Sequence, residues 1–123
     1  MFIRFVVHAL DPDSNERKGI FQASSERMAR FDLTDAERAW PRAVREWFAE
    51  HLRTPTKFAT SRRHHGKNRG VCWFRHSARA HLAQARSLAR WLEEQGVAVE
   101  ELRSTNPGYV LYADAFQVVV DPF

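Results

Sequence analysis

Acidic residues are absent from one 42-residue stretch of this chain, residues 51–92. The same stretch contains ten lysine and arginine residues, whereas residues 1–50 carry a formal charge of −1 and residues 93–123 carry −5. The net charge of +4 therefore conceals a strongly cationic middle segment. Such a distribution directs positive potential toward a polyanion or an acidic protein surface, but it identifies neither the partner nor a reaction.

Cysteine and glycine are also scarce. The single cysteine, Cys72, excludes an intramolecular disulfide, and its place in the apolar run Val71-Cys72-Trp73 predicts a buried thiol. Five glycines leave little room for a loop that cradles phosphate, and Gly66-Lys67-Asn68 lacks the other residues of a P-loop. No G-x-S-x-G motif is present either.

Long apolar runs are missing too. No stretch approaches the ~20 residues that a membrane helix requires, and the N-terminal sequence has no apolar segment typical of a signal peptide. We therefore expect a soluble, cytoplasmic protein with no membrane association.

What the chain does contain is enough large apolar surface for one core. Its 123 residues are 44% hydrophobic and include four tryptophans and nine phenylalanines. We expect one α+β domain over residues 1–123, with a mixed, mostly antiparallel sheet of about five strands and two main helices packed on it. The expected strands are residues 2–10, 71–74, 97–103, 109–112 and 116–120.

Local signals place the helices. Thr34 and Glu37 form a capping-box pattern at the start of one helix, in which Pro41 predicts a kink or a restart. Ser77 begins the second helix, and Gly96 marks its end. Between Gly19 and Ala23 we expect a short extended piece, followed by a short helix to about residue 31. The order strand, helix, strand over residues 71–103 suggests a right-handed crossover.

Residues 53–70 show no helical or strand period and form a long basic loop, a type of segment that is functional or disordered in compact domains. In the second helix, Arg79, Arg86 and Arg90 lie within roughly 40° of one another, outside the apolar side. The loop leads to the same end of this helix. The candidate nucleic-acid-binding residues are therefore Arg62, Arg63, His64, His65, Lys67, Arg69, Arg75, Arg79, Arg86 and Arg90.

The function that we expect from this pattern is binding of nucleic acid through its phosphates, with little base specificity and no catalysis. The alternative is a protein-interaction module, an inhibitor or accessory subunit, that docks an acidic protein. Such an interface needs an apolar anchor, and Trp91 lies about 120° from the apolar side of its helix, where we expect it to be exposed.

Five of the six histidines also fall in the cationic stretch. Their spacing does not suit a metal, because His76 and His81 are five positions apart on the predicted helix and no carboxylate is near in sequence. We expect His81 to be packed and hydrogen-bonded. His64 and His65 with the surrounding cations leave a third possibility, a metal-independent RNase-like enzyme. The sequence indicates no cofactor. It also does not indicate the oligomeric state.

Overall fold

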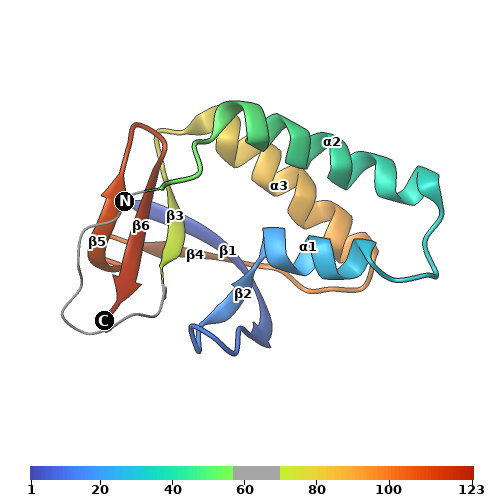
Figure 1. Ribbon diagram of the computed structural model, residues 1–123, viewed down its shortest axis with the longest axis horizontal. Helices are drawn as coiled ribbons and strands as arrows, with labels where there is room; N and C mark the ends of the chain where they lie inside the picture. Colours follow the sequence, from blue (N-terminus) through green and yellow to red (C-terminus); the bar gives the residue numbers. More distant parts are fainter. Residues whose placement is uncertain (57–69) are drawn as a thin grey trace.

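The structure, a computed structural model, describes residues 1–56 and 70–123 and forms a single small α+β domain (Figure 1). The predicted fold class is confirmed: three helices pack on a curled, antiparallel six-stranded sheet. In chain order the elements are β1 Phe2–Leu10, β2 Arg17–Gly19, α1 Ile20–Met28, α2 Asp35–His51, β3 Val71–Arg75, α3 Arg79–Glu94, β4 Glu100–Ser104, β5 Gly108–Ala113 and β6 Gln117–Pro122.

Strand β1 is central to the sheet. The strand order is β2-β1-β3-β6-β5, and β4 also pairs with β1. Phe2 is in register with Arg75 of β3 and with Ser104 of β4, so these two strands flank β1 on opposite sides. Because both run antiparallel to β1, β3 and β4 are parallel to each other with β1 between them. The crossover through α3 thus connects strands that are not neighbours.

Several local details differ from the sequence predictions. Helix α3 begins at Arg79 with Ala78 as its N-cap, and not at Ser77. The segment after Gly19 is helical from Ile20 instead of extended, and residues 17–19 form the strand β2. Strand β4 begins at Glu100, three residues later than predicted. As a residue Cys72 is exposed beside a cavity, but its thiol donates to Oε1 of Gln117 at 3.2 Å, and burial raises the pKa of that thiol to about 12. The stop of α3 at Gly96 is confirmed, with a φ of +84° that suits glycine.

Helix α2 passes through Pro41 as one helix, and its capping box is formed as predicted. A proline lacks the N–H that would bond to the carbonyl four residues earlier, here that of Glu37. That carbonyl oxygen instead accepts a hydrogen bond from Nε1 of Trp91 on α3, at 2.9 Å. The unpaired backbone group created by Pro41 is therefore satisfied by the neighbouring helix.

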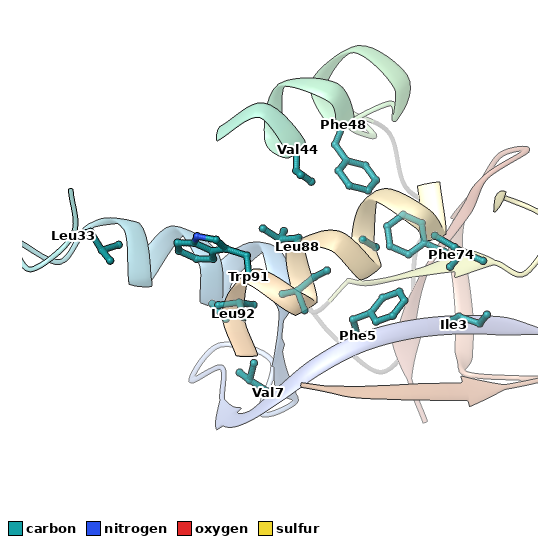
Figure 2. Close-up of a cluster of buried hydrophobic side chains, with 14 residues drawn as sticks. Ile3, Phe5, Val7, Leu33, Val44, Phe48, Phe74, Leu88, Trp91 and Leu92 are labelled. Carbon is teal, nitrogen blue, oxygen red and sulfur yellow. The ribbon is translucent and has the colours of Figure 1, made fainter. Parts of the chain in front are cut away.

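The main core lies between the helices and one face of the sheet, as Figure 2 shows. Ile3, Phe5 and Val7 alternate along β1 and are buried there, as the sequence pattern predicts. The expectation that Trp91 is exposed is wrong, because this residue is only 5% exposed. Helix α3 packs against α1 and α2 as well as facing the sheet, so its buried side is wider than one apolar stripe.

Candidate nucleic-acid interface

Six of the ten candidate residues lie outside the described part of the chain, which omits residues 57–69. They are Arg62, Arg63, His64, His65, Lys67 and Arg69. The RNase-like possibility depends on His64 and His65 and therefore has no structural description. The four candidates that the structure describes are Arg75, Arg79, Arg86 and Arg90.

Helix α3 presents three of these four on its outer side. Arg79, Arg86 and Arg90 are exposed, while the buried residues of α3 occupy the opposite arc. Among the described residues, no carboxylate oxygen lies within 4 Å of a side-chain nitrogen of Arg79 or Arg90. These two guanidinium groups are therefore available to an external anion.

Arg86 has a different environment. Its Nε donates to Oε1 of Glu101 on β4 at 3.0 Å, and its guanidinium lies 6.0 Å from the ring centre of Phe5. The other oxygen of Glu101 accepts from Arg103, also at 3.0 Å. Burial favours a higher pKa for Glu101, but the hydrogen bonds from Arg103 and Arg86 outweigh it, and the pKa is lowered. The carboxylate stays ionised and partly neutralises Arg86.

Arg75 contributes mainly to the structure. Its Nε donates to the backbone carbonyl of Asp114 at 2.7 Å, and its guanidinium lies 5.6 Å from the ring centre of Phe2. The side chain is half-buried. These contacts connect β3 to the turn between β5 and β6 and hold Arg75 in place.

An exposed tryptophan, Trp40, lies next to Arg90, and the apolar pattern of the sequence did not identify it as exposed. Trp40 follows the apolar spacing of α2, which is typical of a core residue, yet it is 56% exposed. Trp40 and Arg90 line a shallow depression of about 360 Å³ between α2 and α3, together with Ser87, Trp91 and Glu94. An exposed indole and a free guanidinium are thus adjacent on one surface.

The described histidines are structural or isolated. His81 is 5% exposed, and its Nε2 donates to the backbone carbonyl of His51 at 2.7 Å. Its ring stacks on Phe116 with centroids 4.3 Å apart, so the packed and hydrogen-bonded environment predicted for His81 is confirmed. Within residues 1–56 and 70–123, no group of three or more histidine, cysteine, aspartate or glutamate residues is placed to hold a metal ion.

Comparison with known proteins finds no matching family model, no matching curated protein and no matching solved structure. Among the helices of the described chain, none is long and apolar enough to cross a membrane.

Proposed function

We propose that the outer side of α3 and the adjacent Trp40 bind nucleic acid, through phosphate contacts with little base specificity. The observation that carries this proposal is that Arg79 and Arg90 lie on one exposed helix side and form no ion pair with any described residue. Eleven residues of helix separate them by about 16 Å, which corresponds to roughly five phosphates along one strand of a duplex. The same backbone could therefore contact both guanidinium groups.

Trp40 adds a second type of contact. A base can stack on an exposed aromatic ring whatever its identity, and a neighbouring arginine can neutralise the phosphate beside it. Trp40 and Arg90 line one depression and provide this combination. Stacking requires an unpaired base, so this arrangement favours single strands over duplexes.

The test is fluorescence anisotropy with labelled single-stranded and double-stranded oligonucleotides. The double variant Arg79→Gln/Arg90→Gln should bind more weakly, and the slope of log K against log salt should become shallower by about 1.8 on the duplex and about 1.4 on the single strand. Arg42→Gln is the control, because Arg42 is an exposed arginine of α2 that does not line the depression. Equal affinities of the double variant and the wild type would reject the proposal.

An acidic protein partner is the second candidate, and exposed Trp40 is the observation that favours it. With Trp91 buried, Trp40 becomes the apolar anchor that such an interface requires. This candidate predicts no binding of either oligonucleotide at low salt and recovery of an acidic protein that Trp40→Ala releases.

A further inference from the structure

A cavity lies where strands β1 and β3 separate, and it is distinct from the α3 surface. Strand β1 pairs with β3 only at Phe2 and Ile3, and it pairs with β2 further along, at Val6. The space that opens between the strands has a volume of about 470 Å³ and is lined also by the start of α1 and the end of α2. None of its lining residues is on α3.

One part of the cavity lining is aromatic. Phe5, Phe21, Phe48 and Phe74 all line it, and the rings of Phe21 and Phe48 meet edge to face with centroids 4.8 Å apart. Figure 2 shows Phe48 of α2 and Phe5 of β1 pointing into the layer between helix and sheet. Phe5, Phe48 and Phe74 also belong to the main core and are only 4–6% exposed, so half-buried Phe21 is the most accessible of these rings to a flat organic group.

The polar part of the lining is cationic. Arg4, Arg45 and Arg53 line the cavity, and Asp11 is the only acidic residue among its lining residues. The cavity therefore has a formal charge of about +2 at neutral pH. Among the described residues, no carboxylate lies within 4 Å of Arg4 or Arg45. Neither guanidinium therefore forms a direct ion pair with a described residue, although Glu16 and Asp11 act on Arg4 from a longer distance.

Arg4 and Arg45 are both half-buried and held in place. Nη2 of Arg4 donates to the carbonyl of Arg17, and burial is the main cause that lowers the pKa of Arg4. Nη1 of Arg45 donates to the carbonyl of Phe21 at 3.0 Å, and the described residues provide no acceptor for its Nε or Nη2. A desolvated guanidinium without a direct ion pair is costly, and a bound anion would reduce that cost.

We propose that this cavity binds a small organic anion: an aromatic or apolar body packs against the phenyl rings, and a carboxylate or phosphate group pairs with Arg4 and Arg45. Guanidinium groups match both types of oxyanion with paired hydrogen bonds. The volume falls within the range of ordinary ligand sites. The inference is independent of the nucleic-acid proposal, since the two use different residues.

The test uses three probes of similar size: 2-naphthoate, 1-naphthyl phosphate and the neutral 2-naphthol. Each is titrated into the ¹⁵N-labelled protein while backbone amide NMR signals of cavity residues, such as Ala49 and Cys72, are followed. At least one anion should shift these signals and bind at least tenfold more tightly than 2-naphthol. The tighter of the two anions identifies the preferred head group.

Variants then assign the head group to its arginines. Arg45→Gln should weaken binding of the preferred anion about tenfold, whereas Arg42→Gln, one turn earlier on α2 and outside the cavity, should leave it unchanged. If Arg45→Gln does not fold, Arg4→Gln replaces it. Absence of shifts with both anions, equal binding of 2-naphthol, or unchanged binding by both folded arginine variants would overturn the proposal.

Discussion

Two tryptophans line the depression between α2 and α3, and one of them is available to a ligand. Trp91 is only 5% exposed, and its indole N–H donates a hydrogen bond to the carbonyl of Glu37. Trp40 is 56% exposed. From the sequence we expected Trp91 to be the exposed tryptophan, and the apolar spacing of α2 did not identify Trp40 as exposed. Apolar spacing identifies the side of a helix that faces the core. It does not show which end of that helix extends beyond the core, or whether a second helix covers residues beside the apolar side.

At the residue scale, Trp40→Ala should weaken binding of single-stranded nucleic acid about 5- to 150-fold, the loss expected for one stacked base, or about 1–3 kcal/mol. Anisotropy at fixed salt measures this loss. Phe31→Ala is the matched control, since Phe31 is a fully exposed aromatic residue that does not line the depression. If both variants bind as the wild type does, Trp40 takes no part in recognition.

At the scale of elements, Pro41 and Trp91 act as a pair. Proline deprives Glu37 of its usual backbone donor, and the indole of Trp91 provides another one from α3. The sequence alone shows Pro41 inside a helical pattern and thus predicts an unpaired carbonyl. It does not show that α3 crosses α2 at this point, because that depends on tertiary packing.

A double-mutant cycle tests this pairing. Trp91→Phe should lower the free energy of unfolding by about 1–3 kcal/mol, because it leaves the Glu37 carbonyl unsatisfied. In a Pro41→Ala background the same change should cost less, since alanine has the backbone N–H that restores the helical donor. Urea unfolding of the four proteins measures the coupling. Identical costs in both backgrounds would contradict this account of α2.

The turn between β5 and β6 is organised by Asp114. Its carboxylate accepts hydrogen bonds from the backbone N–H groups of Phe116 and Gln117, from Nε2 of Gln117 and from the hydroxyl of Tyr112. Burial favours a higher pKa for Asp114, but these hydrogen bonds outweigh it and the pKa lies below its ordinary value. The ionised form is therefore stabilised in the folded protein.

Asp114→Ala should reduce the free energy of unfolding by about 2–3 kcal/mol at neutral pH. A folded-state pKa that is depressed gives stability above the unfolded-state value of about 4, and this stability is lost as the pH falls through the folded-state pKa. The difference in the free energy of unfolding between Asp114→Ala and the wild type should thus become smaller below about pH 4. Urea unfolding at several pH values measures it, and a pH-independent difference would exclude the carboxylate as the cause.

At the scale of the whole molecule, folding redistributes the charges. The acid-free stretch of the sequence does not remain free of acids in space, because β4 pairs with β1 and brings Glu101 to Arg86. The fold class was predictable, since alternation, capping and turn residues act locally. Strand order was not, and neither was the Arg86–Glu101 ion pair, because both depend on contacts between distant segments.

The Arg86–Glu101 ion pair leads to a further prediction about the affinity for nucleic acid. Glu101→Gln should release Arg86 and Arg103, strengthen nucleic-acid binding a few-fold and steepen the salt slope by about 0.7–0.9 for each of them that contacts a phosphate. Glu26→Gln is the matched control, because it removes a carboxylate of α1 that is paired with Lys18 of β2, away from α3 and β4. A Glu101→Gln protein with the same affinity and slope as Glu26→Gln would show that Arg86 does not contact phosphate.

The measurement that tests the central claim most directly is the salt dependence of nucleic-acid binding by the unmodified protein. If six of the candidate lysine and arginine residues each neutralise one phosphate, the slope of log K against log salt should be about −5 on duplex DNA, and Arg79 and Arg90 alone should account for about −1.8 of it. A slope of this magnitude would support recognition of nucleic acid through its phosphates. A slope near zero, or no binding at low salt, would contradict it.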